Sequence, residues 1–307
     1  MKGIIYTKDI YREIVPKIIQ DEASWSRFLA FSSNLYHMGF ENASLIYAQR
    51  PDARLVETYT GWRDKGRYVR RGSKGIAIID SAHYKPYVDH VFDVADTNGR
   101  AYTEIWRLDK SNEKEIFALL HTEAENREAY VKEAVEKELY GSGKKYLENI
   151  GDLCRCHDSQ NPEHIYDITN ALVKSAEYMA VCRIMGEPPP ASALFPVLPT
   201  APKLMVYGLC NTALMVAGQV LTGIEKVFDL RRTMEKGKEQ GIGQKERDTG
   251  NDRTGQGIKT LRDQPHQNAG TLKRQGDAAH KRNKGAGYEQ LSLSFDGGYA
   301  FYDCGRT

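Results

Sequence analysis

The sequence predicts an α+β fold, in which a small antiparallel sheet with flanking helices is followed by a helical subdomain and a disordered C-terminal tail. Short runs rich in Val, Ile, Tyr and Trp alternate with glycines over residues 55–108, as expected of strands joined by turns. Apolar residues recur at helical spacing over residues 111–232. Beyond residue 236 large aliphatic residues are rare, so this segment buries too little apolar surface to offset its ordering entropy.

The same observations divide the chain into three parts. We expect an α+β domain over residues 1–110 and a helical subdomain packed on it over residues 111–235. A mostly disordered, mildly basic tail is expected over residues 236–307. Within this tail, alternating Leu and Phe side chains favour a short docking segment over residues 288–301.

Composition limits the class of protein. With 40% apolar and 10% aromatic residues, the chain can fill a hydrophobic core. Its net charge is only +2, so a nucleic-acid site must come from local clustering of Lys and Arg. The five cysteines follow no disulfide framework and no secretory signal opens the chain, so a cytoplasmic protein is expected. Residues 204–224 are long enough to cross a bilayer, but Asn211, Thr212 and Gln219 within them favour a buried helix.

The N-terminal part is predicted to contain two helices before the strands. Ser24 is the expected N-cap of a first helix that ends at Gly39, and Pro51 stops a second helix over residues 42–49. The dipeptide Asn98-Gly99 is typical of a hairpin turn. Strands are expected over residues 55–59, 67–70, 76–80, 87–94 and 101–108.

The part that follows is predicted to be helical. A helical pattern begins at Ser111 and ends near Tyr140, where two glycines break it. A longer helix is expected over residues 162–185 and a last one over residues 204–232. The expected inner face of the longer helix consists of Ile165, Ile168, Leu172, Ala176, Met179 and Ala180.

Positive charge concentrates in residues 62–75, WRDKGRYVRRGSKG, where six of the fourteen residues are cationic and only Asp64 opposes them. Trp62 and Tyr68 lie among the charges. Cations bind phosphates, and exposed aromatic rings stack on the bases that a single strand leaves free. A solvated, charged hairpin around a tryptophan in the core is the alternative interpretation of the same segment.

The spacing of residues in this region resembles the N-terminal domain of ArdC-type antirestriction proteins, which also occurs in TraC-type primases of conjugative plasmids. The resemblance covers roughly residues 20–110 and implies single-stranded-DNA binding without sequence preference. It is carried by Asn42, Leu45, Ile46, Gln49, Pro51, Ala53, Trp62, Gly66, Arg67, Val69, Gly72, Lys74, Gly75 and Ile76.

Residues 91–97, 175–183 and the apolar helix near residue 207 are similar to the N-terminal region of helicase–methyltransferase proteins from integrative conjugative elements. The chain itself has no Walker A loop and no Rossmann glycine fingerprint. The His-Glu-x-x-His motif of the protease-like domain in ArdC-type proteins is also absent, so protease chemistry does not transfer by analogy.

The first hypothesis is therefore a non-enzymatic single-stranded-DNA-binding protein of a conjugative or integrative mobile genetic element, without a cofactor or metal. In a second interpretation of two of its residues, Asn42 and Gln49 hold the helix against the hairpin by hydrogen bonds. Transfer, replication and protection from restriction all expose single strands, so the process stays open. The predicted nucleic-acid-binding residues are Asn42, Gln49, Arg50, Trp62, Arg63, Lys65, Arg67, Tyr68, Arg70, Arg71 and Lys74.

Two other classes of function stay open. A protein-binding inhibitor of host defence, acting on restriction or CRISPR effectors, would also suit a mobile-element protein. Expected partners are thus single-stranded DNA and host-defence or conjugation proteins, and no membrane. A metal-dependent nuclease or primase accessory would need acidic ligands. Asp89, His90 and Asp93 do not share one strand face at a consistent period of two, which favours strand-end capping and surface pairing over a metal site. The loose group to which they belong consists of His83, Asp89, His90, Asp93 and Asp96.

Two remaining features favour ordinary structural roles. Glu177, in the middle of the apolar helix, is expected to face solvent at the helix flank or to pair with an arginine such as Arg183, although a buried functional carboxylate is the alternative. A Cys-x-Cys-His run is not a standard structural-zinc spacing, so an inter-helix loop is favoured over a zinc site. The residues concerned are Cys154, Cys156, His157 and His164.

Overall fold

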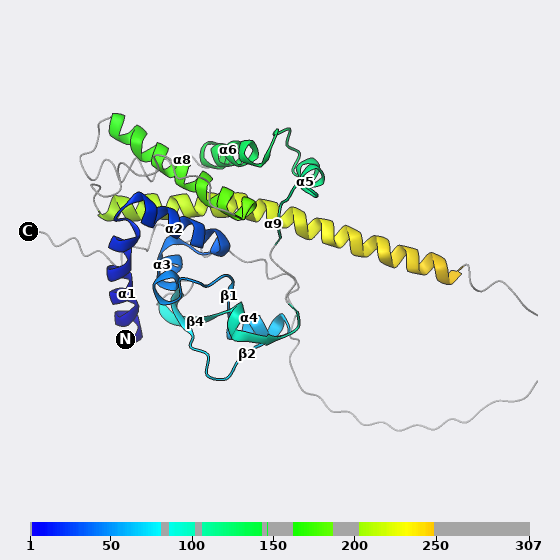
Figure 1. Ribbon diagram of the computed structural model, residues 1–307, viewed down its shortest axis with the longest axis horizontal. Coiled ribbons are helices and arrows are strands. Elements are labelled where there is room, and N and C mark those ends of the chain that lie inside the picture. Colours follow the sequence, from blue (N-terminus) through cyan, green and yellow to red (C-terminus); the bar gives the residue numbers. More distant parts are fainter. Residues whose placement is uncertain are drawn as a thin grey trace, which may run out of the picture. The chain divides into compact units, whose positions relative to one another are not determined.

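Figure 1 shows the computed structural model of the chain, which describes residues 2–80, 86–101, 106–142, 146, 162–186 and 203–248. The predicted α+β fold is confirmed: a small antiparallel sheet has flanking helices, and further helices follow it. The helices are α1 (Lys2–Ile18), α2 (Glu22–Ser32), the short turn η1 (Ser33–Leu35), α3 (Phe40–Gln49), α4 (Tyr59–Asp64), the turn η2 (Val94–Asp96), α5 (Glu113–Leu119), α6 (Arg127–Lys137), the π-helical turn η3 (Glu138–Ser142), α8 (Pro162–Met185) and α9 (Lys203–Asp248). The strands are β1 (Val56–Thr58), β2 (Arg67–Val69), β3 (Ile76–Asp80), β4 (Tyr87–Asp93) and β5 (Thr97–Gly99).

The strands form two antiparallel sheets. One has the order β1-β4-β3, with Ile76 opposite Val91, and the other pairs β2 with β5, with Tyr68 opposite Asn98. Within the described residues, β3 and β1 are therefore the edge strands of the larger sheet. This places the start of β3, which follows the cationic segment, at an edge of the larger sheet.

The predicted hairpin turn at Asn98-Gly99 is wrong, because both residues lie in β5 and pair with β2. Gly99 has a φ of +127°, and a Cβ atom there would lie 2.6 Å from the carbonyl oxygen of Gly66. Glycine is needed at this position for a close approach of two chain segments. Of the strand predicted over residues 101–108, residues 102–105 lie outside the described residues and 106–108 form no strand; Trp106 is buried there.

The first two predicted helices also need correction. Asp21, not Ser24, is the N-cap of α2, because its carboxylate accepts a hydrogen bond from the Ser24 backbone nitrogen at 2.7 Å. After α2 and η1, Gly39 precedes α3 instead of ending a single long helix. No helix was predicted where α1 lies, because its apolar residues recur every three or four positions but are interrupted by charges and by Pro16.

The core gathers aromatic side chains from α2 and α3. The Trp25 and Phe28 rings stack with their centroids 5.6 Å apart, and the Phe28 and Phe40 rings meet edge to face at 5.6 Å. The Trp25 indole nitrogen donates to the Ser175 hydroxyl on α8 at 2.9 Å, so the helical half packs directly against this cluster. The inner face of α8 is confirmed for the predicted residues with described side chains, which are Ile168, Leu172, Ala176, Met179 and Ala180.

The last helix, α9, begins as predicted but continues to Asp248, beyond the predicted end at residue 232 and into the predicted tail. Glu, Lys and Gln are good helix formers, which accounts for the extension without an apolar face. By contacts, the described chain divides into one unit that ends at Asp229 and a second that begins at Leu230. The predicted docking segment at residues 288–301 lies outside the described residues.

No helix in the described part of the chain combines the length and the apolarity that crossing a bilayer requires. The polar residues inside the apolar run are used within the protein instead. The Asn211 side-chain oxygen accepts a hydrogen bond from the Phe40 backbone nitrogen at 3.2 Å, and Thr212 donates to the Gly208 carbonyl at 2.7 Å. Asn211 thereby caps the first turn of α3, where Gly39 offers no side chain.

Candidate nucleic-acid interface

The cationic segment forms α4, β2 and the loop that leads to β3. A tight turn shapes the loop, since the Ser73 backbone nitrogen donates to the Arg70 carbonyl at 3.1 Å. Gly72 occupies the third position of this turn with a φ of +88°, a conformation that favours glycine. The Arg70 backbone nitrogen donates to the Asp96 carbonyl at 2.8 Å and anchors the loop to η2. The loop is therefore a defined structure, in which the side chains of Arg71 and Lys74 are exposed.

Trp62 is a core residue, which corrects its place among the predicted nucleic-acid contacts. Its side chain is fully buried, and its indole nitrogen donates to the Phe92 carbonyl at 2.8 Å. Lys65 covers the ring, with its ammonium nitrogen 5.6 Å from the centroid, and pairs with Glu57 at 2.7 Å. The ring is thus closed to a stacking base, and Lys65 already has an acidic partner.

Asn42 and Gln49 use their amides on the backbone of β3, as the second interpretation expected. Asn42 accepts from the Ile79 nitrogen and donates to the Ile79 oxygen, both at 2.9 Å. Gln49 accepts from the Ala77 nitrogen at 3.0 Å and donates to the Ala77 oxygen at 2.8 Å. These amides position β3 against α3 rather than reaching toward a ligand.

Three of the predicted arginines are held by groups of η2 and β5. Arg50 forms an ion pair with Asp96, and Arg70 donates to the Ala95 carbonyl. The Arg67 guanidinium donates to the Thr97 hydroxyl at 2.7 Å and to the Thr97 carbonyl at 3.1 Å. Because these bonds fix the side chains, the arginines connect the end of α3, strand β2 and the loop with η2 and β5.

The remaining predicted residues are open to solvent. Tyr68 is 60% exposed on β2. Arg63, Arg71 and Lys74 are exposed and make no side-chain hydrogen bond or ion pair with the residues that the structure describes. Arg100, which was not among the predicted residues, is also exposed and follows β5 directly, beside Gly66. Four cations and one aromatic ring of this region are thus exposed, and the four cations make no ion pair with the residues that the structure describes.

A groove of about 610 Å³ lies where one face of α1 meets the end of α3 and the start of β3. The predicted residues Gln49, Arg50 and Lys74 line it. The lining residues of α1 were missed because no helix was predicted over residues 2–18, although Ile10, Ile14 and Ile18 recur at helical spacing there. The other lining residues are Tyr6, Ile10, Glu13, Ile14, Lys17, Ala48, Gly75 and Ile76.

The acidic group around β4 serves to cap backbone. Asp93 accepts from the backbone nitrogens of Arg54 and Ala95, at 2.8 and 2.9 Å. Asp96 pairs with Arg50, and no group of three or more His, Cys, Asp or Glu within the described residues could hold a metal ion. His83, Cys154, Cys156 and His157 lie outside the described residues, as does the side chain of His164.

Charged groups in the helices have structural partners. Glu177 pairs with Lys174 at 3.2 Å, whereas Arg183 is buried and donates to the Trp106 carbonyl at 2.7 Å. Burial raises the pKa of Glu41, in the first turn of α3, to about 7, although the charge of Lys8 opposes the rise. Glu41, near Lys8 of α1, is therefore an acidic group whose pKa lies near neutral pH.

Comparison with known families gives one match. Residues 6–137 match the N-terminal domain of anti-restriction factor ArdC. The matched range begins at Tyr6 in α1 and ends at Lys137, the last residue of α6. No curated protein and no solved structure matches the chain.

Proposed function

We propose that the chain is an antirestriction-related mobile-element protein that binds single-stranded DNA without sequence preference and without catalysis, because residues 6–137 match the N-terminal domain of anti-restriction factor ArdC. The exposed cations beside Tyr68 carry this proposal. Arg63, Arg71 and Lys74 have no acidic partner among the described residues, so their charge is available for phosphates. Binding would take place in the cytoplasm, where transfer and replication expose single strands.

The chemistry of this surface favours a single strand over a duplex. The Tyr68 ring is 60% exposed and can stack on a base only where that base is free of its complement. Stacking and phosphate contacts carry no base-edge information, which accounts for binding without sequence preference. The bonds of Arg67 and Arg70 to β5 and η2 hold the surface in shape before DNA arrives.

The test is fluorescence anisotropy with a labelled single-stranded oligonucleotide at two salt concentrations. We expect Arg71→Ala and Lys74→Ala each to weaken binding and to reduce the slope of log affinity against log salt by about 0.7, the value for one lost phosphate contact to a single strand. Lys132→Ala, at an exposed position on α6, is the matched control. Equal affinity of all three variants would overturn this site, and binding without salt dependence would overturn the electrostatic mechanism.

A second candidate function is direct inhibition of a host restriction or CRISPR effector, which the antirestriction family of residues 6–137 favours. The helical half has exposed side chains suited to a protein partner, among them Tyr166 and Tyr140. Co-purification with a host nuclease after DNA has been digested, without oligonucleotide binding, would support this function. Oligonucleotide binding without such co-purification would support the first proposal.

A further inference from the structure

The groove between α1 and the start of β3 combines an exposed ring, an apolar floor and positive charge. We infer that it holds part of the DNA strand, with Tyr6 stacking on a base and Lys17 and Lys74 contacting phosphates. The inference rests on the proposed function and adds α1 to the binding surface. The volume of about 610 Å³ lies within the range of roughly 300–1,000 Å³ that is typical of small-ligand sites, so a nucleotide fits.

Each part of the groove suits one part of a nucleotide. Tyr6 is 59% exposed, and the half-buried side chains of Ile10 and Ile14 lie one and two turns further along the same face of α1. Lys17 and Lys74 are exposed. Base–aromatic stacking tolerates any base, and the lysines supply point charges for phosphates.

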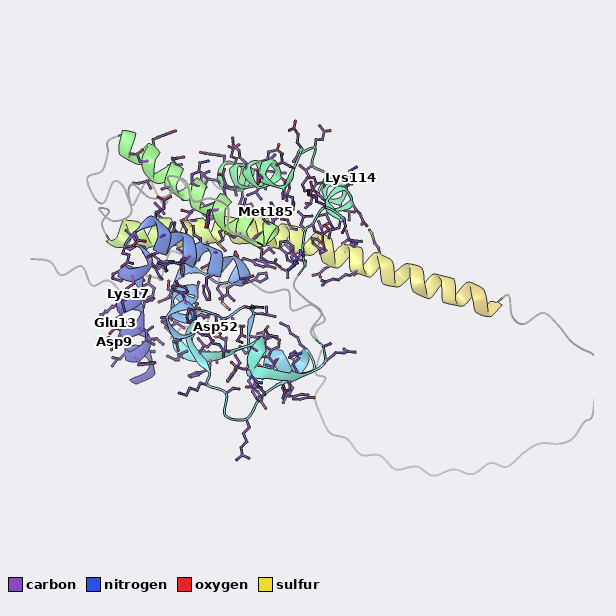
Figure 2. All side chains as sticks on the ribbon, in the orientation of Figure 1. Asp9, Glu13, Lys17, Asp52, Lys114 and Met185 are labelled. Carbon is purple, nitrogen blue, oxygen red and sulfur yellow. The ribbon has the colours of Figure 1, made fainter. Side chains whose placement is uncertain are left out.

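The charge of the groove is positive overall. Lys17, Arg50 and Lys74 line it, and Glu13 is the acidic residue of the lining. Figure 2 shows Glu13 and Lys17 in line along α1, with Asp9 one turn before them. Asp96 neutralises Arg50, so the two lysines supply the charge that remains free for a polyanion.

The edge of β3 argues against an extended peptide as the occupant. A peptide that added a strand to β3 would need the outward main-chain groups of Ala77 and Ile79. These groups are already bonded to the amides of Gln49 and Asn42. Recognition at this groove must therefore come from side chains, and an aromatic ring between cations recognises a nucleic-acid strand.

The groove continues the cationic surface described above. Lys74 lines the groove and lies three residues after Arg71 in the loop between β2 and β3. A strand bound at Tyr68 and Arg71 therefore has a route past Lys74 to Tyr6. Lys74 thus joins the loop and α1 into a single binding site, although the two elements lie more than fifty residues apart in the sequence.

The test uses the full chain, a labelled single-stranded oligonucleotide and anisotropy. We expect Tyr6→Ala to weaken binding by about 5- to 150-fold, the range for loss of one stacked base, and Tyr6→Phe to bind like the wild type. Lys17→Ala should reduce the salt slope by about 0.7. Tyr166→Ala, which removes an exposed ring from α8, and Lys132→Ala should leave affinity unchanged.

A second measurement locates the strand directly. Irradiation of a complex with an iodouracil-substituted oligonucleotide, followed by peptide mass spectrometry, should give a crosslink at Tyr6 that Tyr6→Phe retains and Tyr6→Ala loses. Salt-dependent binding that neither Tyr6→Ala nor Lys17→Ala alters, with no crosslink in α1, would overturn the groove inference and leave the proposed function standing. Absence of oligonucleotide binding by the wild type would overturn both.

Discussion

Asn42 and Ile79 exchange two hydrogen bonds, each 2.9 Å long, between the side-chain amide of one and the backbone amide of the other. Gln49, two helical turns further along α3, makes the same pair of bonds with Ala77. The two amides thus occupy the edge of β3 as a neighbouring strand would. Because β3 begins directly after the loop that carries Lys74, this arrangement fixes the position of the binding surface relative to α3.

These amides are expected to matter for stability more than for DNA contact. Gln49→Met keeps the size of the side chain but leaves the Ala77 nitrogen and oxygen without partners, which should lower the free energy of unfolding by about 1–3 kcal/mol. Urea denaturation followed by circular dichroism measures the change. Affinity of the folded variant for oligonucleotide should fall less than for Lys74→Ala. Normal stability combined with lost DNA binding would instead make Gln49 a ligand contact.

Two glycines of α9 should respond in opposite directions to the same substitution. A Cβ atom at Gly218 would lie 2.4 Å from the Tyr36 carbonyl oxygen, so Gly218→Ala must push α9 away from Tyr36. We expect this overpacking to lower the free energy of unfolding by about 1–3 kcal/mol or more. A Cβ atom at Gly223 would enter open space, with no atom from outside its own helical turn within 4 Å, so Gly223→Ala should stabilise the helix by up to about 1 kcal/mol.

Thermal unfolding of both alanine variants beside the wild type gives the comparison. A lower melting temperature for Gly218→Ala together with a higher one for Gly223→Ala is the expected result. If the two variants unfolded at the same temperature, the close packing of α9 on Tyr36 would not hold in solution.

Sequence patterns predicted β3 and α8 at their observed bounds because each has a regular period and clear punctuation. They missed α1, where charges interrupt the apolar repeat, and they misread Asn98-Gly99, where glycine serves a close approach to Gly66. Such contacts join residues far apart in the chain, so local rules cannot anticipate them.

The candidate site was predictable in charge but not in detail. The cationic character of residues 62–75 follows directly from composition, and the exposed positions of Tyr68 and Lys74 agree with it. Which cations would be paired depended on Asp96 and Thr97, more than twenty residues away. The burial of Trp62 depended on its bond to Phe92. The sequence thus predicted a cationic surface, whereas tertiary contacts determine which of its residues remain exposed and unpaired.

Glu41 makes stability depend on pH. Burial raises the pKa of this carboxyl from 4.5 to about 7 in the folded protein, so the folded state binds its proton more tightly than the unfolded state does. The resulting stability is fully present below pH 4.5, declines as pH rises to 7 and is lost above 7. Glu41→Gln, which cannot ionise, should therefore stabilise the protein at pH 8 by on the order of 3 kcal/mol and have little effect at pH 4.

Chemical denaturation at about pH 4, 6 and 8 measures this effect. Glu136→Gln, which neutralises an exposed carboxylate on α6, serves as the control and should show no comparable trend. A constant difference between Glu41→Gln and the wild type at all three pH values would show that the carboxyl ionises in the folded protein as it does in the unfolded chain.

Glu13 is the acidic residue of the groove lining, and its charge opposes that of the strand we place there. Glu13→Gln should tighten binding of a single-stranded oligonucleotide about two- to threefold at low salt, because a unit charge about 7 Å from a phosphate in water is worth ~0.6 kcal/mol. Salt should reduce the gain, since added ions screen exposed charges. Asp9→Asn neutralises a carboxylate on the same helix that does not line the groove, and we expect it to change affinity less. Equal gains from both variants would mean that only the net charge of α1 matters, whereas a gain confined to Glu13→Gln would place the phosphates beside the groove.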